Sequence, residues 1–194
     1  MVRVMGDKMP AGRAGGARAE LTRPVVLVGM MGCGKTAVGT ALADRLGVPF
    51  RDTDAAMAEA ARMSVPEIFA RDGEPFFRAR ETEVLARVLR EGPGVVSTGG
   101  GAFLRAENRA AIEAVGVAVW LQADADLLWS RVRHKSTRPL LMTADPRGTL
   151  EALLAARLPA YAQARLVVAS APDVPIPAMV DRVIGVLRDA GVLA

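Results

Sequence analysis

The sequence of 194 residues is poor in the side chains that build disulfides and metal clusters: it has one cysteine, Cys33, and one histidine, His134. A single cysteine can form no disulfide within the chain and no cysteine-based metal cluster, so a cytoplasmic location is expected. No apolar run approaches the roughly 20 residues that are needed to cross a bilayer. Residues 1–22 also lack the apolar core of a secretory signal. We interpret them as a disordered N-terminal extension before a single domain at 23–194.

Lysine is scarce, occurring only at positions 8, 35 and 135, so arginine carries most of the positive charge behind the formal net charge of +4. The arginines are scattered among aspartates and glutamates, and no basic block with interleaved aromatic residues occurs. This pattern argues against nucleic acid as a partner, whereas small anionic substrates account equally well for a modest positive excess. No helical pattern has a spare apolar stripe. We therefore expect a monomer without nucleic-acid or membrane partners.

An apolar run at 25–28 is followed by a glycine-rich turn and then by Lys35 and Thr36. Together with Gly29 and Gly34, these two residues fit the phosphate-binding pattern G-x-x-x-x-G-K-[ST]. Glycines let the backbone wrap closely around an anion and aim its N–H groups inward. The helix that follows adds its unpaired N–H groups and the positive end of its dipole. The lysine would reach the β- and γ-phosphates and the threonine would bind Mg²⁺, so the pattern predicts nucleotide binding.

Short apolar runs alternate with helical patterns along the rest of the chain. The runs predict strands at 25–28, 49–52, 94–97, 117–121 and 166–169. The helical patterns predict helices at 35–46, 55–62, 65–71, 75–90, 106–115, 125–132, 148–163 and 177–190. We expect Asp54 and Asp124 to cap two of these helices, and Ser64 with Glu67 to form a capping box. This alternation predicts an α/β fold, a five-stranded parallel sheet with helices on both faces. The polar, irregular segment at 133–147 is a candidate lid.

Parallel sheets bind their ligands beyond the carboxyl ends of the strands. This rule gathers the phosphate loop, Asp52, Asp54 and the glycines at 99–101 at one rim. The two aspartates are two positions apart, so on an extended strand they point to the same face. One could bind Mg²⁺ and the other could take or orient a substrate hydroxyl proton; a helix cap plus a surface carboxylate is the alternative. The strand at 94–97 ends without a carboxylate, which favours Asp52 for the metal.

Several arginines have two possible interpretations. Arg78 could be a solvated side chain that pairs with Glu74 or Glu81, or it could bind an anionic substrate. Arg131 and Arg138 flank or lie in the candidate lid. An arginine that a lid brings in can neutralise charge on a transferring phosphoryl group, although each of them alone is more often a surface charge. The local sequence leaves these alternatives open.

The motifs taken together resemble the shikimate kinases, which have the P-loop fold of the nucleoside monophosphate kinases. The motifs that carry this resemblance are GMMGCGKT at 29–36, DTD at 52–54, FR at 77–78, GGG at 99–101, RPLL at 138–141 and RLPAY at 157–161. They occur in order over about residues 25 to 169, nearly the whole expected domain. One departure concerns residues 170–173, where the family often has an arginine or asparagine beside the adenine. The adenine contacts after the last strand therefore stay open.

The resemblance implies ATP-dependent phosphorylation of shikimate at its 3-hydroxyl, with Mg²⁺ as cofactor, in the biosynthesis of chorismate and aromatic amino acids. The implied catalytic residues are Asp54, Lys35 and Arg138. The implied shikimate-binding residues are Asp54, Arg78, Gly99, Gly100, Gly101 and Arg157. The implied ATP-binding residues are Gly32, Cys33, Gly34, Lys35, Thr36, Ala37, Arg131 and Arg138. The implied ligands of the single Mg²⁺ ion are Thr36 and Asp52.

Two other functions are compatible with a phosphate loop. Another small-molecule kinase of the same architecture, for gluconate or a nucleoside monophosphate, is the nearer one. A gluconate kinase lacks the pairing of DTD with the glycine triplet, and a nucleotide kinase needs a base-binding pocket for its acceptor. The other is a catalytically idle nucleotide-binding module, for which loss of Asp54, Arg78 or Arg138 would be the signature. All three residues are present in the chain.

Overall fold

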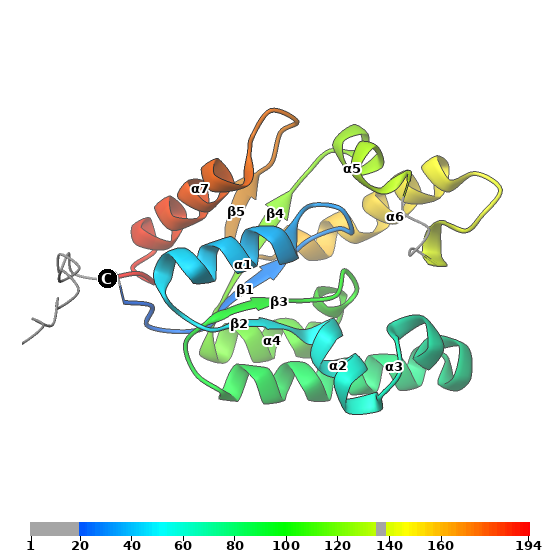
Figure 1. The fold of residues 1–194 in the computed structure, drawn as a ribbon, viewed down its shortest axis with the longest axis horizontal. Helices are drawn as coiled ribbons and strands as arrows, with labels where there is room; N and C mark the ends of the chain where they lie inside the picture. Colours follow the sequence, from blue (N-terminus) through cyan, green and yellow to red (C-terminus); the bar gives the residue numbers. More distant parts are fainter. Residues whose placement is uncertain (1–19, 135–138) are drawn as a thin grey trace, which may run out of the picture.

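The computed structural model describes residues 20–134 and 139–194. Five strands form one parallel sheet in the order β2-β3-β1-β4-β5 (Figure 1). The strands are β1 (Val25–Val28), β2 (Phe50–Asp52), β3 (Val95–Ser97), β4 (Val117–Gln122) and β5 (Leu166–Ala169). The central strand β1 pairs with β3 on one side and with β4 on the other. All four of its residues are buried and apolar, as expected for a parallel strand covered on both faces. The predicted five-stranded parallel α/β fold is confirmed.

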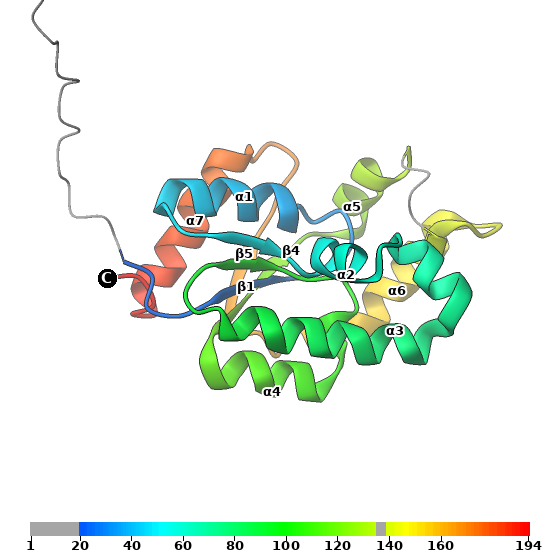
Figure 2. The same ribbon diagram turned by 60° about the horizontal axis from the view of Figure 1, so that its bottom comes forward.

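Helices cover both faces of this sheet (Figure 2). Helices α1 and α7 lie against one face, and α3 and α4 lie against the other. The helices of the described part are α1 (Lys35–Leu46), α2 (Thr53–Ala61), α3 (Val65–Arg90), α4 (Ala106–Val115), α5 (Ala125–Val132), α6 (Pro146–Tyr161) and α7 (Ile176–Asp189). Two short 3₁₀ helices, η1 (Ala102–Leu104) and η2 (Pro139–Leu141), join them.

The start of α2 corrects one prediction about helix capping. The helix is capped by Asp52 and not by Asp54, because β2 ends at Asp52 in an extended conformation and the helix begins at the next residue. The Asp52 Oδ1 atom accepts hydrogen bonds from the backbone N–H groups of Asp54, at 3.0 Å, and of Ala55, at 3.2 Å. The predicted cap at Asp124 and the capping box of Ser64 with Glu67 are confirmed.

The predicted helices at 65–71 and 75–90 are two parts of α3. They join at Gly73, whose φ of 77° and ψ of 171° are not helical. The capping box starts the first part, and Pro75 lies near the start of the second. The helix therefore bends at Gly73, which lies between the two predicted segments.

Several predicted boundaries were wrong by one or two residues, and two corrections change the description of the fold. Helix α6 begins at Pro146, two residues early, because the Asp145 carboxylate accepts a hydrogen bond from the Gly148 N–H at 2.9 Å and caps it. The irregular part of the candidate lid is correspondingly shorter, it contains η2, and its residues 135–138 lie outside the described ranges. At the N-terminus, Leu21 is buried and forms a β-bridge with Leu193, so the predicted disorder is wrong for the described end of that segment. Residues 1–19 lie outside the described ranges.

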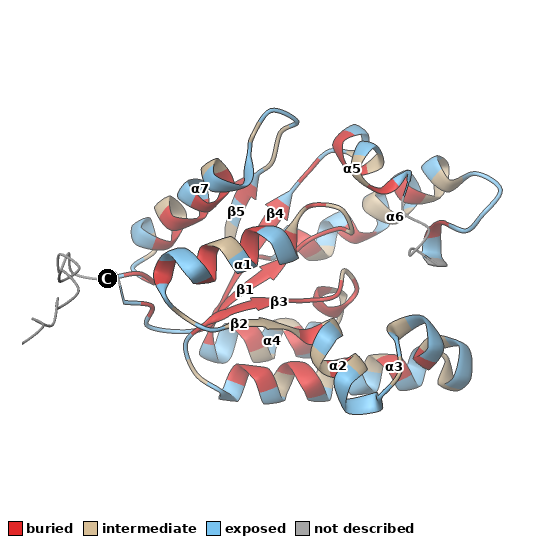
Figure 3. Cartoon of the chain, in the orientation of Figure 1, coloured by how far each residue is buried: buried red, intermediate tan, exposed pale blue. Residues whose placement is uncertain are grey.

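Buried residues concentrate on the strands and on the inward sides of the helices (Figure 3). The core continues from one face of the sheet to the other through β1, β3 and β4. In the described ranges, no helix combines the length and the apolar character that a membrane span requires. Residues directly after β2 and β3, among them Asp54 and Thr98, line a cavity at the carboxyl ends of the strands, which is the predicted rim.

Candidate active site

The phosphate loop follows β1 and leads into α1, as predicted. Gly29, Gly32 and Gly34 have φ values of 139°, 85° and 99°, a region that side chains with a Cβ atom rarely adopt. Space is short as well, because a Cβ atom on Gly29 would lie 2.8 Å from the Leu121 carbonyl oxygen. The loop ends at Lys35, so the unpaired N–H groups of the first turn of α1 face the loop. The backbone here is a preformed anion site.

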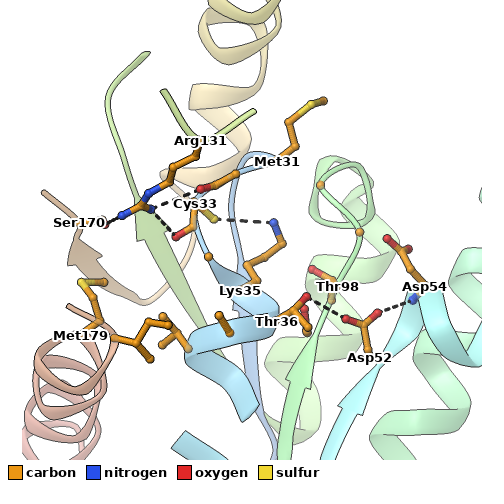
Figure 4. Close-up of a pocket in the computed structure, with 18 of the residues that line it drawn as sticks. Met31, Cys33, Lys35, Thr36, Asp52, Asp54, Thr98, Arg131, Ser170 and Met179 are labelled. Carbon is orange, nitrogen blue, oxygen red and sulfur yellow. Dashed lines mark hydrogen bonds between the residues drawn. The ribbon is translucent and has the colours of Figure 1, made fainter. Parts of the chain in front are cut away.

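Lys35 lies inside this loop with its side chain almost fully buried. Its ammonium donates hydrogen bonds to the carbonyl oxygens of Gly29, at 2.8 Å, and of Met30, at 3.1 Å. The Cys33 sulfur is 3.7 Å from the same nitrogen (Figure 4). The loop backbone thus holds the positive charge beside the N–H groups that would bind a phosphate.

Thr36 and Asp52 meet at the start of α1, as the proposed metal site requires. The Thr36 hydroxyl is 3.1 Å from the Asp52 Oδ2 atom, while Oδ1 of the same carboxylate caps α2 (Figure 4). A hydroxyl and a carboxylate are hard oxygen ligands, which Mg²⁺ prefers. The described residues contain no group of three or more metal-binding side chains. A bound Mg²⁺ would therefore take its other ligands from water and phosphate oxygens, as this ion commonly does.

Asp54 lies in the first turn of α2, beside the glycine-rich loop that follows β3 (Figure 4). A Cβ atom on Gly99 would lie 2.7 Å from Asp54 Oδ1 and 2.9 Å from Glu81 Oε1. Glycine is therefore the residue that fits between these two carboxylates. Glu81 is 1% exposed, and its Oε1 atom has no hydrogen-bond partner among the described residues. Burial raises the pKa of Glu81, although Arg78 opposes this shift.

Arg78 is held on the other side of the same loop. Its Nη1 atom donates to Glu81 Oε2 at 2.8 Å, and its Nε and Nη2 atoms each lie 3.3 Å from Glu74 Oε1. The guanidinium also lies 5.2 Å from the ring centre of Phe77. A Cβ atom on Gly101 would collide with the guanidinium. Both predicted pairings thus occur, but the side chain is only 18% exposed and faces the glycine triplet instead of solvent.

Arg157 and Tyr161 approach the triplet from α6. Arg157 is buried, with Nη1 3.7 Å from the Met30 sulfur and 3.5 Å from the position of a Cβ atom on Gly100. The Tyr161 hydroxyl donates to the Gly100 carbonyl oxygen at 2.6 Å. Burial raises the pKa of Tyr161 to about 12, so this hydroxyl keeps the proton that it donates. Helix α6 therefore fixes the triplet through one hydrogen bond and brings a buried cation beside it.

Arg131 links the phosphate loop to the segment after β5. Its Nη1 atom donates to the carbonyl oxygens of Gly32, at 3.3 Å, and Cys33, at 3.4 Å, and its Nη2 atom lies 3.4 Å from the Ser170 hydroxyl (Figure 4). Ser170 and Met179 line the same end of the site. The contacts after β5 could not be predicted, since nothing local to residue 170 indicates that Arg131 lies beside it.

A single cavity of about 530 Å³ connects these parts, a volume suited to a small-molecule ligand. The predicted site residues that line it are Gly32, Cys33, Gly34, Lys35, Thr36, Ala37, Asp52, Asp54, Gly99, Gly100 and Arg131. Gly101, Arg78 and Arg157 are not among its lining residues, but Arg78 lies beside Gly101 and Arg157 lies beside Gly100. Arg138 lies outside the described residues. The arrangement can hold a polyphosphate at one end and a small anionic acceptor at the other.

Two residues beside the glycine triplet, Glu81 and Tyr161, were not predicted to have a role in the site. Glu81 was considered only as a surface partner of Arg78. Its position three residues after that arginine on the same helix is the one signal that could have indicated their contact. Tyr161 belongs to the RLPAY motif but was given no role. The position of each depends on how α3 and α6 pack against the loop after β3.

Comparisons with known proteins agree with this geometry. The shikimate kinase family model matches residues 31–188. A shikimate kinase of Ruegeria pomeroyi is 62% identical over 172 residues, which cover 89% of this chain and 88% of that protein. One of Cereibacter sphaeroides is 62% identical over 152 residues, 78% of this chain and 76% of the relative. The structure of the shikimate kinase from Acinetobacter baumannii in complex with shikimate has a TM-score of 0.79 at 34% identity, covering 87% of this chain and 92% of that chain.

Proposed function

The chain belongs to the shikimate kinase family, and we propose that its cavity transfers the γ-phosphoryl group of ATP to the 3-hydroxyl of shikimate. As a member of this family it is an ATP-using kinase, and its product would be shikimate 3-phosphate for aromatic amino-acid biosynthesis. One observation carries the proposal. A single cavity joins the phosphate loop to Asp54, Gly99 and Gly100, and two arginines lie beside the glycine triplet.

The phosphate loop would bind the donor. The N–H groups at the start of α1 would surround the β- and γ-phosphates, and Lys35 would exchange its two carbonyl partners for phosphate oxygens. Hydrogen bonds between charged groups are stronger than those to neutral carbonyls, so this exchange favours the nucleotide. Arg131 and the segment that contains Ser170 would lie on the adenine side.

Thr36 would ligate Mg²⁺, and Asp52 would orient that hydroxyl or bind a water of the ion. Held by these residues, the ion would supply positive charge to neutralise the transferred phosphoryl group. Asp52 is well placed for such a role because its second oxygen is fixed by the start of α2. The contact of 3.1 Å between hydroxyl and carboxylate supports this assignment.

Asp54, the triplet and two arginines would bind the acceptor. Shikimate is a small carboxylate with several hydroxyl groups. Arg78 and Arg157 would bind its carboxylate, since a planar guanidinium matches that group in two hydrogen bonds. Arg78 is already paired with Glu81 and Glu74, whereas Arg157 forms no ion pair within residues 20–134 and 139–194, so its positive charge is available to the substrate. Asp54 would orient or accept the proton of the attacking hydroxyl.

The remaining assignments follow from the resemblance alone. Arg138 lies outside the described residues, and its role at the transferring phosphate stays a prediction. We also expect a monomer. The exposed large apolar side chains of the described part are spread over several elements, which supports this expectation. We expect this monomer in the cytoplasm, where its ATP is available. Light scattering on the purified protein and fractionation of cells would check these two expectations.

The test of the proposed function is coupled ADP release with ATP and Mg²⁺, comparing shikimate, gluconate, AMP and no acceptor. We expect turnover with shikimate alone. Turnover with another acceptor would keep the kinase assignment and remove shikimate from the site. Absence of turnover with every acceptor, in folded protein that still binds ATP, would instead favour the idle nucleotide-binding module.

A further inference from the structure

A second cavity of about 470 Å³ lies between α2 and α3. It shares no lining residue with the active-site cavity and is of similar size. Arg80, which lines it, is two positions from Arg78, so the two side chains leave α3 about 200° apart. The cavity therefore opens on the side of α3 that faces away from the glycine triplet. Helices α2 and α3 lie side by side in both ribbon views (Figures 1 and 2).

The floor of this groove is apolar. Met57 of α2 and Ile68 and Val84 of α3 are buried there and line the cavity. Ala60 adds a small side chain on the α2 wall, which leaves room above the floor. Phe76 lies at the edge with 39% of its surface exposed, an unusually open position for a large aromatic side chain.

The rim of the groove is strongly positive, with four arginines and one glutamate. Arg80 pairs with Glu83 at 2.6 Å, and Arg71 pairs with Asp72 at 2.7 Å. Arg87 and Arg90, in contrast, form no ion pair with any residue of the described ranges. Their place in the last turn of α3 suits the helix dipole, but the dipole does not explain an apolar cavity below them. The outward side of this region is exposed in Figure 3.

We propose that this groove is a binding site for a small aromatic carboxylate. The apolar floor would bury the ring, and Arg87 with Arg90 would bind the carboxylate through charged hydrogen bonds. A ring also suits the edge of the site, where the Arg80 guanidinium already lies 5.1 Å from the centre of the Phe76 ring. The cavity volume of about 470 Å³ matches one small molecule, which favours such a ligand over a polypeptide or a nucleic acid.

The test uses 4-phenylbutyrate as the probe, added to isotope-labelled full-length protein that is saturated with ADP and shikimate. Occupying the active site in this way prevents the anion from binding there. We expect saturable shifts of backbone amide signals in α2 and in the second part of α3, with one molecule bound per chain.

Two variants test the two halves of the site by different means. The double substitution Arg87→Ala with Arg90→Ala removes the unpaired cations and should raise the dissociation constant at least tenfold. Ala60→Trp fills the groove without changing its charge and should abolish binding. All three positions are exposed, so folding should persist, and Arg188→Ala on α7 is the matched control that should bind like the unaltered protein.

Several outcomes would overturn the site. These are no saturable shift, shifts confined to other elements, or binding that survives both sets of substitutions. Titration with an acidic amphipathic peptide tests the alternative that the groove binds another protein. Binding of that peptide by a protein that ignores 4-phenylbutyrate would make the groove a docking surface for another protein.

Discussion

Asp52 and Asp54 are two residues apart, yet the structure gives them different surroundings. The Asp52 Oδ1 atom accepts a hydrogen bond from the first turn of α2, and its Oδ2 atom accepts one from the Thr36 hydroxyl. Asp54 is placed by the same helix start against the glycine triplet. A carboxylate that orients a metal site and one that handles a substrate proton can therefore come from one short turn.

Asp54→Asn should lower turnover by about 100-fold or more, the usual contribution of a positioned general base. ATP affinity and the free energy of unfolding should change little, because the amide keeps the shape of the carboxylate. Steady-state kinetics and nucleotide titration measure these quantities. Glu59→Gln, an exposed change in the same helix, is the control. Turnover within a few-fold of normal would remove Asp54 from the chemistry.

Glu81 should make the free energy of unfolding depend on pH, and the direction of this dependence follows from the burial of its carboxyl group. Its pKa is raised in the folded protein above the ordinary value of 4.5. The folded state thus holds this proton more tightly than the unfolded chain does. The associated stability is complete below pH 4.5 and is lost as the pH rises through the raised pKa.

Glu81→Gln mimics the protonated form at every pH. The unfolding free energy of this variant, relative to the unaltered protein, should therefore increase as the pH is raised from acidic to neutral. Urea titrations across that range measure the difference. Glu113→Gln, at an exposed position on α4, should show no such trend. A difference that is constant with pH would contradict the raised pKa.

At the scale of elements, α6 is tied to the loop after β3 by the hydrogen bond from Tyr161 to Gly100. Tyr161→Phe removes a hydrogen bond to the part-buried Gly100 carbonyl, which costs about 1 kcal/mol of unfolding free energy. The KM for shikimate should rise more than the KM for ATP, because the loosened loop is the acceptor side of the site. Thermal unfolding and substrate titrations check both effects.

Ser130→Ala is the matched control for that substitution. It removes a hydroxyl that donates to the Leu127 carbonyl oxygen within α5, far in sequence from the triplet. We expect a similar kind of stability loss without a selective change in the KM for shikimate. Equal kinetic effects of the two variants would mean that α6 does not position the triplet.

The start of a helix could be predicted when the residues that cap it form a local sequence pattern, and could not when the neighbouring strand decides where the helix begins. Ser64 with Glu67 and the cap at Asp124 are local patterns, and both were predicted correctly. The cap of α2 was misplaced because Asp52 and Asp54 are equally good capping residues, and only the end of β2 decides between them. Asp145 before Pro146 was a usable start signal for α6 that the irregular composition of the surrounding segment obscured.

At the scale of the whole molecule, the sequence predicted the open rim because parallel strands place their carboxyl ends together. The phosphate loop, Asp54 and the triplet could be assigned to it from their order alone. Ser170 beside Arg131 could not, since that contact joins segments about 40 residues apart. Its position depends on how β5 pairs with β4, which no local pattern contains.

The two ends of the described chain also meet at this scale, where Leu21 bridges Leu193. Leu21→Ala should lower the free energy of unfolding by about 2–3 kcal/mol, the lower part of the range for a buried leucine. Turnover at ordinary temperature should be unchanged, because the bridge lies before the amino end of β1, whereas the active site lies beyond the carboxyl ends of the strands. Urea unfolding measures the first effect, with the exposed Val115→Ala as control. A stability loss as small as that of the control would show that the bridge is dispensable.

The meeting of the two ends has a practical meaning for handling the enzyme. The Ala194 N–H donates to the Glu20 carbonyl oxygen at 3.1 Å, so a linker of a few residues would join residue 20 to residue 194. New ends could then be opened at an exposed connection, which makes the chain a candidate for circular permutation. The junction lies before the amino end of β1, at the pole opposite the cavity (Figure 1). An enzyme tethered to a solid support through this pole would keep its substrate entrance facing the solution.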